Sequence, residues 1–353
     1  MDDTTQLFAS INHLKNKRDL TQQEIASCVQ ELVKESTSLE LKKRFLLSLS
    51  QKGESDDEFA HFVNEFRKLS IDPNLGDFAD RAIDLCGTGG DKANSFNIST
   101  FVSFMLASAG IPVIKHGNRS ISSKCGSADL IEAIGIPLSC TEEKRLEGMK
   151  KLNFSFLFAP QFHPAFKHIG PVRKSLAEEG IITIFNLLGP AINPAQPSNQ
   201  LLGVFSPKYM QKISHALTSN DVTSGLVVHG FLPNGPVSGV DELTSCGENK
   251  ICGIGKNKAN LMEIWEPSRW KQKEGSFNDL AGGTLDQNIK IMKTLIEGNA
   301  PPALLSTVII NAATAFWIVG RCSSLGEGAE LAESILTDGL IKKWLSEVDV
   351  FFK

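Results

Sequence analysis

Three short polar motifs carry the side chains best suited to chemistry: a glycine-rich stretch at residues 84–91, a hydroxyl-rich stretch at 95–100 and a basic stretch at 115–119. The glycines lack side chains, so the backbone there can take positive φ and approach a ligand closely. Lys115 adds a compact positive charge of the kind that binds phosphate. Together the motifs predict a site for an anionic, phosphate-bearing ligand.

The apolar runs around these motifs must position them. Residues 81–85 and 111–114 have the pattern of short strands, and the apolar run 101–109 that of a helix whose N-terminus follows residues 97–100. Free N–H groups and the helix dipole favour phosphate at such an N-terminus. Ligands of open α/β sheets bind at the carboxyl ends of the strands, so we expect all three motifs at one edge of a sheet.

Length and charge narrow the class of protein. The chain has 353 residues, 41% of them hydrophobic, which is enough for one large domain and a smaller one. Its net charge of −4 and lack of long charge runs argue against a nucleic-acid partner. We expect no membrane span, because no apolar run reaches about 18 residues. An acidic start without an apolar signal segment and seven scattered cysteines indicate a cytoplasmic protein with reduced thiols.

The chain divides into a helical part and an alternating part. Residues 1–74 are helical in pattern, with a capping box at Thr21–Glu24 and a third helix expected to begin at Asp56 or Asp57. From residue 81 strands alternate with helices, which indicates an α/β layer fold. Expected strands include 154–158, 201–205 and 225–229, and we expect the helical segment 168–190 to return to the N-terminal helices.

Several motifs occur in the order and rough spacing of one known family, and nearly the whole chain takes part. They are Gly87-Thr-Gly-Gly-Asp91, Ser95-Phe-Asn-Ile-Ser-Thr100, the stretch 115–123, Gly126-Ser-Ala-Asp129, His163-Pro164, Pro171-Val-Arg-Lys174, the stretch 183–190 and Gly239-Val-Asp-Glu-Leu243. Together they resemble the anthranilate phosphoribosyltransferases. A glycine-rich loop alone would be weak support, whereas this ordered set is specific.

The resemblance implies transfer of the phosphoribosyl group of phosphoribosyl pyrophosphate to the amine of anthranilate, with release of pyrophosphate, in tryptophan biosynthesis. It implies a small all-helical domain, residues 1–74 completed by about 165–192, hinged to a large α/β domain, 75–164 and 193–353. The large domain would hold a central, mostly parallel sheet of the nucleoside phosphorylase type. Family members are homodimers that meet through the helical domain.

The resemblance also assigns the residues that hold phosphoribosyl pyrophosphate and metal. Breaking the C1–O bond of ribose requires neutralisation of the departing pyrophosphate, for which Mg²⁺ with carboxylates is suited. Asp241 and Glu242 match the family's metal-binding pair and Ser99 a hydroxyl ligand, with two Mg²⁺ ions per active site. Alone, the acidic pair would be an exposed loop and Ser99 a helix cap. The positions that match the phosphoribosyl pyrophosphate site are Gly87, Gly90, Asp91, Ser95, Asn97, Ser99, Thr100, Lys115, Ser123 and Ser127.

The anthranilate site follows from the same resemblance. Arg173 matches an arginine whose planar fork suits the carboxylate of anthranilate. The other matching positions are Gly87, His116, Asn118 and His163. We interpret the two histidines as positioning groups rather than general bases, because an aromatic amine is already a neutral nucleophile at pH 7.

Two departures from the family pattern bear on the acceptor. Ile182 stands where the family usually has an arginine, and the segment 176–182 is longer than the common form. One alternative is a related phosphoribosyltransferase or a phosphorylase with another acceptor. A phosphorylase would use inorganic phosphate and need no acidic metal pair, so Asp241 and Glu242 argue against it. A second alternative, a nucleic-acid-binding paralogue, conflicts with the negative net charge and the complete motifs.

Overall fold

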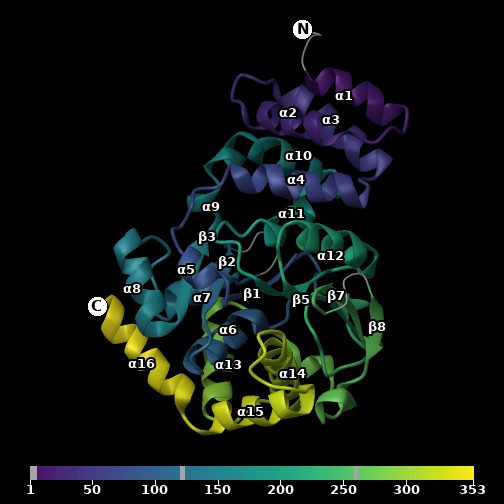
Figure 1. Ribbon diagram of the computed structural model, residues 1–353. Helices are drawn as coiled ribbons and strands as arrows, with labels where there is room; N and C mark the ends of the chain where they lie inside the picture. The colour runs from purple at the N-terminus through teal and green to yellow at the C-terminus, as the bar shows by residue number, and fades with distance from the viewer. Residues whose placement is uncertain (1–5, 120–123, 258–260) are drawn as a thin grey trace.

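The protein combines a helical region with a large sheet that has helices on both faces (Figure 1). The computed structural model describes residues 6–119, 124–257 and 261–353. In Figure 1 helices α1 to α4 and α10 form the upper part, and the sheet lies below them. This is the predicted α/β class with an N-terminal helical region. None of the helices in these described ranges is long and apolar enough to cross a membrane.

Four helices open the chain: α1 (Gln6–Lys15), α2 (Gln22–Val33), α3 (Leu39–Lys52) and α4 (Asp56–Lys68). The predicted capping box of α2 is present, because Thr21 accepts from the main-chain N–H of Glu24 and Glu24 reaches back to Thr21. The helix that begins at Asp56 is the fourth rather than the third. The charged segment 39–52 forms a helix of its own, which begins at a Ser38 cap.

The central sheet has the strand order β3-β2-β1-β4-β5-β7-β8, with β6 paired to β5. The first five of these are parallel: β3 (Phe154–Phe158), β2 (Val113–Gly117), β1 (Ile83–Gly87), β4 (Asn199–Gly203) and β5 (Ser224–Phe231). The antiparallel strands β6 (Gly239–Val240), β7 (Asn249–Gly255) and β8 (Met262–Trp265) extend one side. The parallel strands were predicted from the sequence, whereas the antiparallel strands β6, β7 and β8 were not.

Strands β1 and β2 begin and end two or more residues later than predicted. The prediction ended the second strand at Ile114, where the apolar run ends, yet Lys115 and His116 pair with Phe156 and Leu157 of β3. Pairing with a neighbouring strand therefore extends β2 through two polar residues. As a result Lys115 and His116 lie inside the strand, and both are buried.

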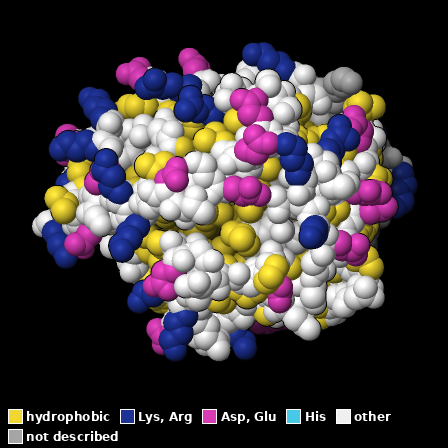
Figure 2. Space-filling view, turned by 90° about the horizontal axis from the view of Figure 1, so that it is seen from below, with side chains coloured by type: hydrophobic (Ala, Val, Ile, Leu, Met, Phe, Trp, Pro, Cys, Tyr) yellow, Lys and Arg dark blue, Asp and Glu magenta, His cyan; other side chains and the backbone are white. Residues whose placement is uncertain are grey.

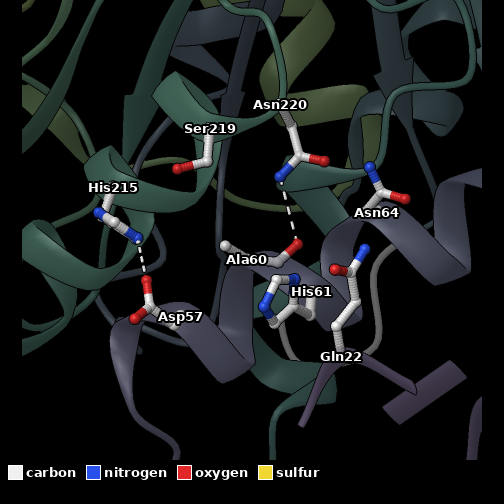
Figure 3. Close-up of a pocket in the computed structure, with 8 residues that line it drawn as sticks. All are labelled: Gln22, Asp57, Ala60, His61, Asn64, His215, Ser219 and Asn220. Atoms are coloured by element: carbon white, nitrogen blue, oxygen red, sulfur yellow. Dashed lines mark hydrogen bonds and ion pairs between the residues drawn. The ribbon is translucent and has the colours of Figure 1, made fainter. Parts of the chain in front are cut away.

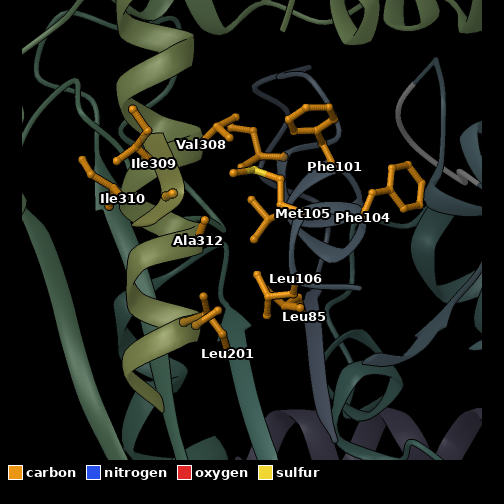
Figure 4. Close-up of a cluster of buried hydrophobic side chains, with 14 of the residues drawn as sticks. Leu85, Phe101, Phe104, Met105, Leu106, Leu201, Val308, Ile309, Ile310 and Ala312 are labelled. Atoms are coloured by element: carbon orange, nitrogen blue, oxygen red, sulfur yellow. The ribbon is translucent and has the colours of Figure 1, made fainter. Parts of the chain in front are cut away.

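Two hydrophobic clusters cover the faces of the sheet. Figure 4 shows Leu85 and Leu201 of the sheet against α6 (Ile98–Ser108) and α14 (Pro302–Ile318). Successive strand residues point to opposite faces, so the next residues, Cys86 and Leu202, join a second cluster. That cluster includes α12 (Met210–Ser219) and the helical region. The helical region and one face of the sheet thus share a continuous core.

The predicted helical segment 168–190 is two helices, α10 (Gly170–Glu178) and α11 (Phe185–Ala191). Gly180 takes a φ of 72°, a left-handed conformation that ends α10. Both helices contribute to the cluster that contains α1 to α4. Ile182 lies between them with 42% of its surface exposed. Its carbonyl accepts from Ser50 Oγ at 2.7 Å, so it lies against α3.

The remaining elements flank the sheet or connect it to the helical region. The helices are α5 (Gly76–Ala79), α7 (Ser127–Ala133), α8 (Glu142–Leu152), α9 (Ala159–Phe162), α13 (Leu285–Ile296), α15 (Leu325–Thr337) and α16 (Leu340–Phe352). Short 3₁₀ helices cover Pro164–His168, Pro207–Tyr209, Pro267–Trp270 and Phe277–Leu280. Seen from below, in Figure 2, basic and acidic side chains are interspersed over the surface rather than gathered by sign.

Candidate active site

The glycine loop after β1 closes around Asp241. The main-chain N–H of Gly89 donates to Asp241 Oδ2 at 2.7 Å, across 152 residues of sequence. Gly89 has a φ of 65°, which favours glycine. A Cβ on Gly87 would collide with the Asp241 carboxylate, and a Cβ on Gly203 of β4 would collide with the Asp241 main chain. Both strand ends therefore require glycine to let Asp241 approach.

Lys115 is a buried cation between β1 and α6. Only 2% of its surface is exposed, and its ammonium donates to Leu85 O and, at 3.3 Å, to Ser99 Oγ. The main-chain N–H of Ser99, in the first turn of α6, donates to Glu242 Oε1 at 3.2 Å. Burial lowers the pKa of Lys115, and the negative charge of Asp84 opposes that shift. A basic group, a hydroxyl and an acid thus meet at the predicted edge of the sheet.

The acidic pair, Asp241 and Glu242, has too little positive charge nearby to balance two carboxylates. Burial raises the pKa of Asp241 well above its usual range, and the neighbouring Asp91 and Glu242 add to that shift. Burial also raises the pKa of Glu242 to about 7, although Lys115 partly opposes the shift. As whole residues, Asp241 and Glu242 are partly exposed, so the site is open to a small ion. A bound cation would relieve this electrostatic cost.

The donor set fits a hard cation such as Mg²⁺. Asp241 and Glu242 supply carboxylates and Ser99 supplies a hydroxyl, which are oxygen ligands of the preferred kind. Within the described ranges no three His, Cys, Asp or Glu side chains form a ready-made metal cluster. Mg²⁺ is commonly held by one or two carboxylates with substrate phosphates, and this arrangement matches that pattern.

The hydroxyl-rich stretch leads into the first turn of α6 as predicted, and its side chains make contacts that differ from one another. Asn97 precedes the helix and does not cap it with its side chain. Its Nδ2 donates to Cys125 O at 3.2 Å, and its Oδ1 accepts from Asn288 Nδ2 at 2.9 Å. Thr100 is fully buried, and its hydroxyl has no partner in the described part of the chain. Ser95 lies beside the loop after the Phe277–Leu280 turn through a bridge to Ala281.

The basic stretch after β2 contacts the start of α7. Ser127 Oγ donates to Asn118 O at 3.2 Å, so these two predicted residues lie together. The guanidinium of Arg119 pairs with Asp129 at 2.6 Å and with Glu132 at 2.8 Å. Arg119 therefore braces α7 in this structure. The predicted Ser123 lies outside the described residues.

Three of the five predicted anthranilate residues, His116, His163 and Arg173, are joined by an aromatic cluster, whereas Gly87 and Asn118 lie outside it. His116 Nε2 lies 3.1 Å from His163 Nε2, and the His163 ring meets Phe166 edge-on at 5.5 Å. Phe166 contacts Phe185 at 5.7 Å, and the Arg173 guanidinium lies 5.2 Å from the Phe185 ring. His116 follows Lys115 on β2, so this cluster and the residues predicted to bind phosphate share one strand.

The charge state of these acceptor residues is distinctive. Burial lowers the pKa of His116 to about 3 and that of His163 to about 4, so both are neutral at pH 7. Burial also lowers the pKa of Arg173, and in the described chain its guanidinium has no acidic partner. A cation without a counter-ion beside aromatic rings can receive an aromatic carboxylate.

Three buried polar residues were missed by the sequence analysis. Asn288 on α13 orients Asn97, and nothing in its surroundings in the sequence marks it. Asp84 stands at the start of the glycine-rich motif without an assigned role, and it accepts from Asn193 Nδ2 at 2.9 Å. Asn193 follows a helix in a proline-rich stretch that is typical of a loop. Only hydrogen bonds between distant segments single these residues out.

Two pockets in the described part of the chain lie away from this site. Figure 3 shows one of about 200 Å³ between α2, α4 and α12. It is lined by Gln22, Asp57, Ala60, His61, Asn64, His215, Ser219 and Asn220. The other, about 650 Å³, lies between α8 and α16. Neither contains a predicted substrate-binding residue, so the candidate site rests on its side-chain geometry.

Comparisons with known proteins agree with this site. The pattern of the glycosyl transferase family, a/b domain, matches residues 79–341. Over 344 residues the chain is 33% identical to the anthranilate phosphoribosyltransferase of Desulfosudis oleivorans, and the match covers 98% of each. Over 305 residues it is 39% identical to the bifunctional protein TrpGD of Thermotoga maritima, covering 86% of this chain and 50% of that protein.

Solved structures give the same result. Anthranilate phosphoribosyltransferase from Thermus thermophilus matches with a TM-score of 0.85 at 33% identity, over 97% of this chain and 99% of that one. The enzyme from Saccharomyces cerevisiae matches with a TM-score of 0.84 at 21% identity, over 98% and 97%, a likeness that concerns the fold alone. On these matches, the chain belongs to the anthranilate phosphoribosyltransferase family.

Proposed function

We propose that this chain transfers the phosphoribosyl group of 5-phosphoribosyl 1-pyrophosphate to the amine of anthranilate, giving N-(5-phosphoribosyl)anthranilate and pyrophosphate in L-tryptophan biosynthesis. The observation that carries the proposal is the meeting of the glycine loop, Lys115 and the acidic pair at one sheet edge. Arg173 and its aromatic neighbours are linked through His163 to His116 on β2, the strand that carries Lys115. Family membership supports the same reaction.

On the phosphate side the protein's task is to hold charge that grows on the leaving group. The glycine loop lets main-chain N–H groups approach phosphate oxygens, and the buried Lys115 ammonium adds a fixed positive charge. Such preorganised donors act strongly where water is excluded. Mg²⁺, when bound, would neutralise the pyrophosphate charge, with Asp241, Glu242 and Ser99 as its protein ligands.

On the acceptor side the protein's task is to orient a neutral nucleophile. The Arg173 fork would bind the carboxylate of anthranilate in two parallel hydrogen bonds. His116 and His163 are neutral at pH 7 and hydrogen-bonded to one another, so they would shape the pocket around the ring. Holding the amine beneath C1 of ribose supplies the rate gain that comes from proximity.

Magnesium is part of the proposal, at two ions per active site. The raised pKa of Asp241 and that of Glu242, both caused chiefly by burial, support a cation site. A yeast enzyme of the same fold has been solved with phosphoribosyl pyrophosphate and magnesium. Calorimetric titration of Mg²⁺ in the presence of phosphoribosyl pyrophosphate would give the stoichiometry. A single ion per chain would contradict the two-ion proposal.

The decisive test of function is an assay with the purified full chain. Phosphoribosyl pyrophosphate, anthranilate and Mg²⁺ are mixed, and the conversion of anthranilate is followed by fluorescence. We expect turnover that stops when Mg²⁺ is chelated. No Mg²⁺-dependent turnover would overturn the proposal, and turnover with a nucleoside and inorganic phosphate instead would identify a phosphorylase.

Assembly and location complete the proposal. We propose that residues 1–74 and about 165–192 form one domain, that two copies pair through it, and that the protein is cytoplasmic. Leu39, 52% exposed, and Ile182, 42% exposed, are large apolar side chains on this helical region that such a contact would cover. The chain holds no disulfide among the described cysteines, in keeping with a reducing compartment.

The dimer is tested by light scattering of the intact chain. We expect a dimer of about twice the mass of one chain, and Leu39→Asp should weaken it. Val350 is 78% exposed on α16, outside the helical region, so Val350→Asp is the matched control and should leave the mass unchanged. A monomeric wild-type chain would overturn this part of the proposal.

A further inference from the structure

The main-chain ladder between strands β1 and β2 stops after a single pair of residues. Ile83 pairs with Val113, and this is the one register pair between the two strands. By contrast, β1 pairs with β4, and β2 with β3, over five consecutive residues each. Main-chain groups that a continuous ladder would satisfy must find other partners beyond that pair, because unpaired buried groups are costly.

Side chains replace the missing ladder. The N–H of His116 donates to Asp84 Oδ1 at 3.3 Å, and Asn193 Nδ2 donates to Ile114 O at 2.9 Å. The Lys115 ammonium donates to Leu85 O. Asp84 is fully buried and Asn193 is 3% exposed, so these bonds form where water does not compete.

Asp84 and Asn193 are also bound to each other, and each is fully oriented. Asn193 Nδ2 donates to Asp84 Oδ2 at 2.9 Å, while Asn193 Oδ1 accepts from Ala195 N at 3.0 Å. The orientation of the Asn193 amide is therefore fixed, because its Nδ2 donates on one side and its Oδ1 accepts on the other. Asn193 stands where the chain returns from α11 to β4, so the pair ties β1, β2 and that return together.

The two bonds bracket one residue. Asn193 holds the carbonyl of Ile114, Asp84 holds the N–H of His116, and Lys115 lies between them. We propose that Asp84 and Asn193 are positioning residues of the phosphoribosyl pyrophosphate site, which fix the main chain on both sides of Lys115 and so direct its ammonium into the gap between β1 and α6. This inference rests on the proposed function, since it concerns the same substrate.

The test compares variants of Asp84 and Asn193, which together form the clamp around Lys115, with a matched control in the whole chain. Asp84→Asn keeps the size of the side chain and one acceptor oxygen, but it places a new amide donor against an existing N–H donor. Asn193→Ala removes the amide that binds Asp84 and the Ile114 carbonyl. Asn199 is also buried in the sheet, where its Nδ2 donates to Ala82 O at 3.0 Å at the opposite end of β4. Asn199→Ala therefore removes a similar bond away from the site.

We expect each clamp variant to raise the KM for phosphoribosyl pyrophosphate about tenfold, as the loss of one buried hydrogen bond can do. The KM for anthranilate should stay within about twofold of the wild-type value. The double variant Asp84→Asn/Asn193→Ala should cost less than the product of the two single effects, because both act through Lys115. Asn199→Ala should lower the melting temperature without changing either KM.

Calorimetric binding of phosphoribosyl pyrophosphate distinguishes failure of the proposed function from failure of this inference. If the wild-type chain neither binds nor turns over this substrate, the proposed function is wrong and the clamp has no substrate to position. If the wild type binds and the folded clamp variants bind equally well, the inference alone is overturned. If Asp84→Asn does not fold, Asn193→Ala decides by the same comparison.

Discussion

The phosphate side and the acceptor side of the candidate site are built in different ways. The phosphate side consists of the glycine loop, Lys115 and the acidic pair, joined by charge-assisted hydrogen bonds at the ends of neighbouring strands. The acceptor side consists of two neutral histidines, Arg173 and phenylalanine rings, joined mainly by aromatic contacts. The phosphate side is built by the placement of charges, whereas the acceptor side is built by the packing of aromatic rings.

This difference predicts how each side responds to mutation. Charge changes on the phosphate side should remove activity while the fold survives, because its groups are held by the backbone of the sheet. The acceptor side is part of the core of the helical region, since Phe66 of α4 contacts both Phe166 and Phe185. Changes there should affect the affinity for one substrate, and substitutions of the rings should also affect stability.

The largest expected effect is on the phosphate side. Asp241→Asn with Glu242→Gln should lower turnover by at least about a thousandfold, because transition-state charge loses its compensation. The fold should persist, since the pKa of each acid is raised by burial and the neutral replacements remove charge repulsion. Steady-state kinetics and thermal melting check both parts. Retention of a tenth of the activity would contradict the metal-site assignment.

The next effect tests the close approach of Asp241 to the glycine loop. Gly87→Ala should lower turnover roughly a hundredfold, because its Cβ would displace the Asp241 carboxylate and small misplacements are costly. Gly76→Ala is the matched control, since its Cβ would meet no atom within 4 Å. Equal activity of the two variants, measured under the same conditions, would show that the approach is not needed.

A smaller and more selective effect is expected on the acceptor side. Arg173→Ala should raise the KM for anthranilate about tenfold or more, and leave that for phosphoribosyl pyrophosphate unchanged, as loss of a charged hydrogen-bond pair does. The neighbouring Lys174, with a side chain 80% exposed, provides the control variant Lys174→Ala. An unchanged KM for anthranilate in Arg173→Ala would show that the acceptor binds elsewhere.

The smallest effect concerns stability and pH. Burial lowers the pKa of His116 to about 3 and that of His163 to about 4 in the folded chain. Unfolded histidines take up protons below about pH 6.5, so stability should fall as pH decreases from there towards about 4. Each histidine should lower the free energy of unfolding by roughly 1–2 kcal/mol by pH 5. Denaturant unfolding at pH 7 and 5 should show a shallower decline for His163→Phe, and an identical decline would contradict the neutral pair.

Local patterns in the sequence predicted much of the architecture. The capping box at Thr21 specifies a helix start through bonds between residues three apart, and the strand Phe154–Phe158 is a short apolar run with clear ends. The expected strand ends were wrong where pairing with a neighbouring strand sets the end. Lys115 and His116, for example, belong to β2 because they pair with β3. The split of 168–190 at Gly180 and the separate helix α3 were missed, because periodicity alone does not define where a helix stops.

By itself, the sequence determined the family, the motifs predicted to bind phosphate and the alternation of strands and helices, since these depend on residue type and short-range spacing. Only the tertiary structure decided which distant groups meet. It brings Asp241 to Gly89, Asn193 to Asp84 and Asn288 to Asn97, across 152, 109 and 191 residues. These contacts form because buried polar groups must find partners, and after folding the nearest partners belong to remote parts of the chain.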